Sequence, residues 1–108
     1  MHPKTKMNYS MTLSLKREPY PTDLNNDEWL HIRELIRPDR DVGRKRAVDE
    51  REIVNAILYV WQSGCAWRML PHDLPPWPTV YYYFCRWRRD GTLDAIRMTL
   101  REFKRQAL

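Results

Sequence analysis

The stretch that decides the fold is Trp-Pro-Thr-Val-Tyr-Tyr-Tyr-Phe-Cys-Arg-Trp-Arg-Arg-Asp-Gly, residues 77–91. Large side chains recur along it at the spacing of one helix face, and they are Val80, Tyr83, Phe84 and Trp87. This spacing predicts an amphipathic helix from about Pro78 to Asp90 with those four side chains turned inward. Pro78 suits the first turn of a helix, and Gly91 suits the position just after its end.

The opposite face of the predicted helix is basic and aromatic. Successive residues turn by about 100° around a helix, so Tyr82, Cys85 and Arg89 point away from the inner face. Arg86 lies beside them, Arg88 lies on a flank, and the stretch has no acid before Asp90. A helix that lies against nucleic acid needs cations for phosphates and planar groups for base edges. The residues that we expect to contact DNA here are Thr79, Tyr82, Arg86, Arg88 and Arg89.

A second basic run, Arg44-Lys45-Arg46, lies in a charged connector over residues 39–48. The formal net charge is +5, with most of the excess after residue 40. Taken alone, such a run is typical of a solvated loop. Beside a second basic element, an arm along a DNA groove becomes the better interpretation. We therefore add Arg44, Lys45 and Arg46 to the expected DNA-binding residues.

Two earlier helices carry start signals. Asn25 with Glu28, and Asp49 with Glu52, have the spacing of capping boxes. The first helix is expected to run from Asn25 until Pro38 ends it. The second has a wide apolar face, ends at Gly64 and is expected to be central.

The rest of the chain completes a small helical bundle. One or two turns of helix are predicted within residues 65–71, followed by a rigid proline-rich loop. A last helix begins at Thr92 as N-cap, and its apolar positions are Leu93, Ile96, Leu100, Phe103 and Ala107. That helix either closes the core, which its length favours, or forms a short dimerisation seam. No segment alternates as a strand does, so the expected fold is all-α with a helix-turn-helix-like arrangement.

Motifs for catalysis, metal binding and membrane insertion are lacking in the sequence. Cys65 and Cys85 do not have the spacing of zinc ligands, and no glycine-rich phosphate loop is present. His72 and Asp73 are adjacent in sequence, which rarely gives the geometry of a catalytic dyad. We expect no enzyme activity of this chain alone, no metal and no cofactor. No membrane span or signal peptide is evident, and the expected location is the cytoplasm, associated with the nucleoid.

Several longer stretches resemble the N-terminal domain of bacterial insertion-sequence transposases. They are Leu24 to Trp29, Gly43 to Asp49, Ile53 to Tyr59, Ser63 to Pro71, and Pro76 to Gly91. The resemblance covers roughly residues 19–97. Pro78 stands where Ser or Thr is common in that family, and Cys85 where a polar residue is more usual.

The resemblance implies a helical domain that binds the ends of a mobile element, followed by a ribonuclease-H-like domain with three acidic metal ligands. The expected organisation is a flexible leader over residues 1–18 and one helical domain over residues 19–108, with the catalytic domain absent. The chain would be a truncated or split-frame transposase part whose partner is double-stranded DNA. The alternative is a protein-interaction domain that docks the catalytic transposase subunit or a second copy.

Overall fold

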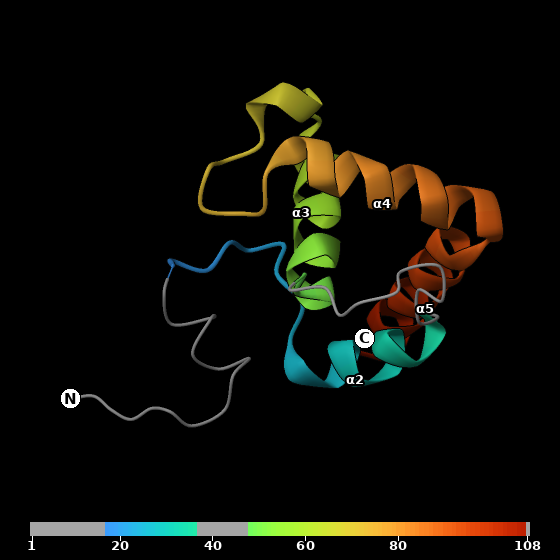
Figure 1. Cartoon of the computed structure of the whole chain (residues 1–108). Helices are drawn as coiled ribbons and strands as arrows, with labels where there is room; N and C mark the ends of the chain where they lie inside the picture. The colour runs from blue at the N-terminus through green and yellow to red at the C-terminus, as the bar shows by residue number, and fades with distance from the viewer. Residues whose placement is uncertain (1–16, 37–47, 108) are drawn as a thin grey trace.

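The computed structural model describes residues 17–36 and 48–107, in which helices and turns occur without any strand. Its α-helices are α2 (Asn26–Ile32), α3 (Glu50–Ser63), α4 (Trp77–Asp90) and α5 (Thr92–Ala107). Two short 3-10 helices, η2 (Arg33–Leu35) and η3 (Trp67–Met69), follow α2 and α3. The expected all-α class is confirmed for these residues (Figure 1).

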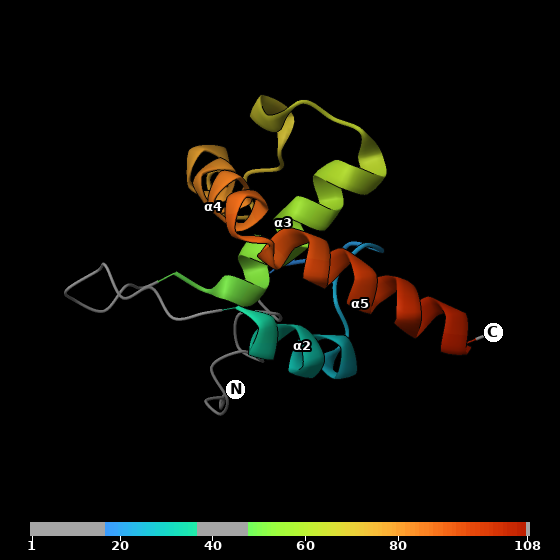
Figure 2. The ribbon, with the colours of Figure 1, turned by 90° about the vertical axis from the view of Figure 1, so that its right-hand side faces the viewer.

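Helix α3 supplies the centre of the core. Every residue from Ile53 to Leu58 is buried, as its wide apolar arc predicts. Helix α4 packs on α3 and α5, and α5 also contacts α2 and η2. Figure 1 shows α4 lying across the end of α3, and Figure 2, turned by 90°, shows α5 running away from α4 above α2. Ile96 of α5 is 1% exposed, so the last helix does close the core.

The first helix begins where the sequence predicts but is shorter. Asn25 and Glu28 form the expected reciprocal capping box. Regular α-helix ends at Ile32, so the extension to Pro38 was wrong for residues 33–36, and Pro38 itself lies outside the described residues. The chain tightens into η2, where the N–H of Ile36 donates to the carbonyl of Arg33. Such 3-10 turns are common at helix ends, and this one leaves Ile36 extended and buried.

The second capping box forms only in part. The Asp49 carboxylate accepts from the N–H of Arg51 at the start of α3. The Glu52 carboxylate accepts hydrogen bonds from the side chains of Arg17 and Asn55. A bond to a guanidinium is charge-assisted and stronger than one to a backbone N–H, so Glu52 turns toward Arg17.

One residue joins the two C-terminal helices. Gly91 has φ +89° and stops α4, as expected. Its carbonyl accepts from the N–H of Ala95, so Gly91 takes the N-cap position that the sequence assigned to Thr92. Thr92 is instead the first helical residue, and its N–H donates to Asp90. Because the turn is so short, the direction of α5 follows directly from the end of α4.

The link between α3 and α4 has more structure than a simple turn. Gly64 ends α3 in the left-handed conformation, and η3 is the short helix predicted within residues 65–71. The connection covers residues 64–76, longer than the turn of about three to four residues in a helix-turn-helix. The helix-turn-helix arrangement therefore stays a prediction. Among the described helices, none combines the length and apolar character needed to cross a membrane.

Candidate nucleic-acid interface

The inner and outer faces of α4 divide as the periodicity predicts. Val80, Tyr83 and Trp87 are buried, while Phe84 is half-buried. On the outer face Tyr82 is 53% exposed and Arg89 is exposed. The outer side chains line one surface depression, namely Pro78, Tyr81, Tyr82, Cys85, Arg86, Arg89 and Asp90. The structure thus brings together three of the predicted DNA-binding residues, Tyr82, Arg86 and Arg89.

Arg86 is held along the helix by a neighbouring ring. Its Nη1 donates to the hydroxyl of Tyr82, with a separation of 3.2 Å between nitrogen and oxygen. The two residues are four apart on α4, so the contact is local and needs no loop to form. This bond positions a planar guanidinium and a phenol on one surface. Such a pair presents hydrogen-bond donors together with a flat ring.

Arg88 occupies a different flank from Arg89. Its guanidinium lies over the ring of Phe84, 5.4 Å from the ring centre. Thr79 is half-buried in the first turn, where its N–H donates to the carbonyl of Pro76. Arg88 and Thr79 do not line the depression that Tyr82, Arg86 and Arg89 share. Of the DNA-binding residues predicted on α4, three therefore lie together at the depression, and the other two, Thr79 and Arg88, lie away from it.

An aromatic cluster packs against the flank of α4 on which Arg88 lies. Trp67 of η3 contacts the rings of Tyr81 and Phe84, with centre-to-centre distances of 5.4 Å and 5.0 Å. Trp77 also lies against Tyr81. Aromatic pairs at these distances contribute about 0.5–1.5 kcal/mol beyond the area they bury. The cluster anchors η3 on α4 and leaves Met69, Trp77 and Tyr81 partly exposed.

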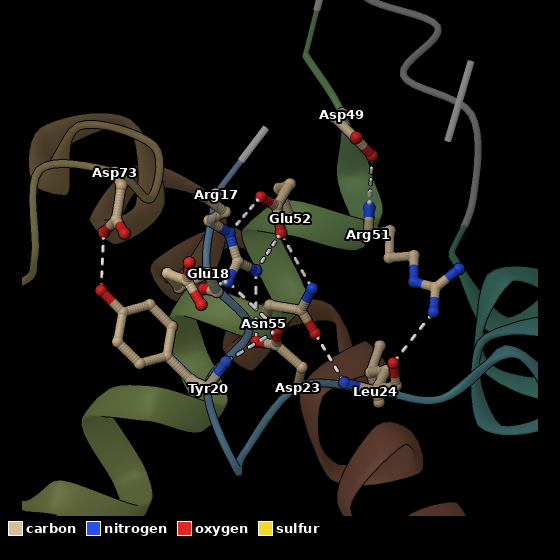
Figure 3. Close-up of polar contacts among 10 residues, drawn as sticks. All are labelled: Arg17, Glu18, Tyr20, Asp23, Leu24, Asp49, Arg51, Glu52, Asn55 and Asp73. Atoms are coloured by element: carbon tan, nitrogen blue, oxygen red, sulfur yellow. Dashed lines mark hydrogen bonds and ion pairs between the residues drawn. The ribbon is translucent and has the colours of Figure 1, made fainter. Parts of the chain in front are cut away.

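The N-terminal segment is tied to α3 by a polar network that the sequence did not reveal (Figure 3). Arg17 donates from Nε and Nη2 to the two carboxylate oxygens of Glu52, at 2.9 Å and 2.8 Å. It also pairs with Asp23 at 3.1 Å. Buried Asn55 accepts from the N–H of Leu24 and donates to Glu52. Arg17 falls within the expected leader of residues 1–18, yet its side chain is 7% exposed and packed against the domain.

Protonation in this network follows from its contacts. Hydrogen bonding to Glu52 raises the pKa of Arg17. Burial acts to raise the pKa of Glu52, but hydrogen bonds from Arg17 and Asn55, with nearby positive charge, bring it below its ordinary value. A hydrogen bond from the Tyr20 hydroxyl to Asp73 raises the pKa of Tyr20 to about 12. The Asp73 carboxylate is thus engaged by the hydroxyl of Tyr20.

Comparison with known families identifies the group to which this sequence belongs. Residues 24–97 match the family described as "Putative transposase of IS4/5 family (DUF4096)". The chain belongs to this IS4/5 transposase family. The matched region includes α2, α3, η3, α4 and the start of α5, so the helices that form the core all lie within it, at least in part. The family resemblance of the sequence motifs is confirmed.

A curated relative of this transposase-family chain is "Uncharacterized protein y4sN" from Sinorhizobium fredii (strain NBRC 101917 / NGR234). The two are 30% identical over 77 residues, which cover 71% of this chain and 62% of the relative. The chain therefore spans less than two thirds of the relative's length. No solved structure gives a significant match.

Arg44, Lys45 and Arg46 lie outside the described residues. Among the residues that are described, no group of three or more His, Cys, Asp or Glu side chains is placed to hold a metal ion. His31 is an exposed residue of α2 whose ring contacts Phe103 edge-on and lies 3.0 Å from the carbonyl of Asp27.

Proposed function

We propose that this chain is a DNA-binding part of an insertion-sequence transposase and recognises the ends of its element. The observation that carries the proposal is the outer face of α4, where exposed Arg89 and Tyr82 lie with Arg86 on a rigid helix. Membership of the IS4/5 transposase family supports DNA as the ligand of this face. The net charge of +5 favours association with phosphates.

In this proposal the residues have distinct roles. Arg86 and Arg89 give forked hydrogen bonds to guanine or phosphate. Tyr82 and Thr79 contact phosphate or a thymine methyl group, and Arg88 reaches phosphate from the flank. The arm of Arg44, Lys45 and Arg46 adds contacts to the backbone or the minor groove. Cleavage and strand transfer belong to a catalytic domain with three acidic metal ligands, supplied by another segment or chain.

The experiment is a salt titration of binding to two duplexes, one carrying the terminal repeats of the element and one with the same bases scrambled. Fluorescence anisotropy with the whole chain should show tighter binding to the terminal repeats. The logarithm of the association constant should fall with the logarithm of salt concentration, by about 0.9 for each phosphate that the protein neutralises. Equal affinity for both duplexes at all salt concentrations contradicts recognition of element ends.

Variants locate the binding surface. Replacing Arg88 and Arg89 with Gln should lower the affinity and reduce the salt slope by about one for each arginine that binds a phosphate. A matched control replaces Arg33 and Arg105, which are exposed on η2 and α5, and should leave the slope nearly unchanged. An unchanged slope in the first variant places the DNA contacts elsewhere.

The second candidate is a protein-interaction domain that docks a catalytic transposase subunit or a second copy. It is favoured by exposed apolar side chains, namely Trp77 and Tyr81, whose rings contact each other, and Met69 of η3, which is 69% exposed. Exposed clusters of large apolar side chains commonly mark interaction sites. Reversing the charge of Arg86 and Arg89 separates the candidates, since it should abolish DNA binding and spare an apolar interface.

A further inference from the structure

A second surface lies away from α4, in a groove between the N-terminal segment, the C-terminal half of α3 and α5. Its volume is about 360 Å³, and α4 contributes no residue to it. We call this surface the α3–α5 groove. The apolar part of its wall contains Leu24, Leu58, Trp61 and Leu100. Leu24 and Leu58 are buried at its base, while Trp61 and Leu100 are half-buried.

One rim of the α3–α5 groove is a row of cations. Arg97, Arg101 and Lys104 project from α5 at positions i, i+4 and i+7, which lie on one side of a helix. All three are exposed, and none forms a salt bridge with a carboxylate of the described residues. The guanidinium of Arg97 lies over the ring of Trp61, 4.9 Å from its centre. This stacking holds one cation at the edge of the apolar wall.

The acids of the opposite wall are already engaged. The Asp23 carboxylate binds Arg17 and the N–H of Tyr20. The Glu28 carboxylate accepts from the N–H of Asn25 in the capping box. The groove therefore presents positive charge along α5 without an internal carboxylate partner among the described residues. An occupant with negative charge on one side and apolar groups on the other is complementary to it.

Two negatively charged ligands could occupy the groove, a DNA duplex or an acidic peptide, and the shape of the groove distinguishes between them. The rigid, convex surface of a DNA duplex could reach the cations of the rim, but its thymine methyl groups lie recessed in the major groove and cannot fill the Leu and Trp wall. A peptide segment with interspersed acidic and apolar side chains can satisfy both. Lodging apolar side chains in such a groove is a common mode of peptide recognition. We infer that the α3–α5 groove binds an acidic, apolar peptide segment of a protein partner. This inference does not depend on DNA binding by α4.

The test uses three short synthetic peptides of equal length, labelled with fluorescein. The first intersperses Glu and Leu, the second Lys and Leu, and the third Glu and Ser. Anisotropy with the whole chain should show saturable binding of the Glu/Leu peptide, about tenfold tighter than either of the others. The indole N–H signal of Trp61 should shift in NMR spectra during the same titration. Equal binding of the three peptides, or no saturable binding of the first, overturns the inference.

Charge reversal provides the second arm of the test. Arg97→Glu together with Arg101→Glu should weaken Glu/Leu peptide binding at least tenfold. The matched control, Arg33→Glu together with Arg105→Glu, also reverses two exposed arginines but not at the groove, and it should change binding less than twofold. Circular dichroism checks that both variants remain folded, as their exposed positions lead us to expect. Equal losses in both variants overturn the inference. Displacement of the peptide and of the Trp61 shift by duplex DNA would reassign the groove to nucleic acid.

Discussion

At the scale of single residues, Arg17 forms a long-range contact that holds the N-terminal segment against α3. Its guanidinium donates two hydrogen bonds to the carboxylate of Glu52, which lies 35 residues later in the sequence. The side chains are 7% and 16% exposed, so solvent screens the pair little. Removing the carboxylate would leave the buried guanidinium charge without its partner. The free energy lost in this way exceeds the net stabilisation that the ion pair provides.

We expect Glu52→Gln to lower the free energy of unfolding by about 2 kcal/mol, because Arg17 and Asn55 both lose a charged acceptor. Urea denaturation measures the change. The comparison is Glu102→Gln, which removes an exposed partner of Arg105 and should cost less than about 0.5 kcal/mol. Equal effects of the two substitutions would mean that the Arg17 pair behaves like an ordinary surface pair.

The same carboxylate gives the stability a pH dependence of known sign. The pKa of Glu52 lies below its ordinary value of 4.5 in the folded chain. Its stabilising contribution is therefore complete above the unfolded pKa and is lost as pH falls through the folded one. Burial raises the pKa values of Asp49 and Glu50, so these groups act with the opposite sign.

Comparing the native chain with Glu52→Gln separates these contributions, since Asp49 and Glu50 are present in both. We expect the difference in unfolding free energy to shrink as pH falls from about 6 to about 3. Urea titrations at each pH measure it. A difference that stays constant over this range contradicts the assignment of the acid-sensitive step to Glu52.

Thr22 shows the reverse situation, a polar atom that packing leaves unsatisfied. Its Oγ1 is buried and is without a hydrogen-bond partner in the described part of the chain. Thr22→Val keeps the shape and removes the hydroxyl, so stability should stay equal or rise by up to about 1 kcal/mol.

Tyr20→Phe should lower stability instead, because the Tyr20 hydroxyl donates to Asp73 at 2.7 Å. Thermal unfolding compares the two, and a destabilised Thr22→Val would show an unseen partner.

At the scale of elements, the junction of α4 and α5 rests on one backbone conformation. Gly91 has φ +89°, and a Cβ added there would meet no atom within 4 Å. The cost of Gly91→Ala is therefore backbone strain alone, about 1 kcal/mol. Gly91→Asn should recover part of it, since Asn tolerates positive φ better than Ala. Thermal unfolding measures both, and equal stability of the Ala variant and the native chain would refute the strain.

The elements also show what sequence can and cannot predict here. Local signals correctly predicted Asn25 as the N-cap of α2 and the inner and outer faces of α4, because capping and periodicity act over a few residues. The contacts of Arg17 and Asn55 were not predicted. The partner of Arg17 is distant in sequence, and Asn55 is a polar residue on the buried face of α3. The α3–α5 groove likewise exists only once three separate segments are packed together.

At the scale of the whole molecule, the two proposed binding surfaces share no lining residue. The outer face of α4 carries Arg89, whereas the α3–α5 groove carries Arg97 and Arg101. Because no residue lines both surfaces, ligands bound to them need not contact the same side chains. Electrostatic coupling between exposed charges is screened over about 8 Å at physiological ionic strength.

We therefore expect the two surfaces to be independent in a double-mutant cycle. Arg89→Gln should weaken duplex DNA binding and leave Glu/Leu peptide binding unchanged, while Arg97→Glu should do the opposite. In the combined variant, the changes in each binding free energy should add within about 0.5 kcal/mol. Anisotropy titrations at physiological salt measure all four chains. A coupling above about 1 kcal/mol that persists at higher salt would show that α4 and the groove respond to each other through the packed helices, because screening removes a purely electrostatic link.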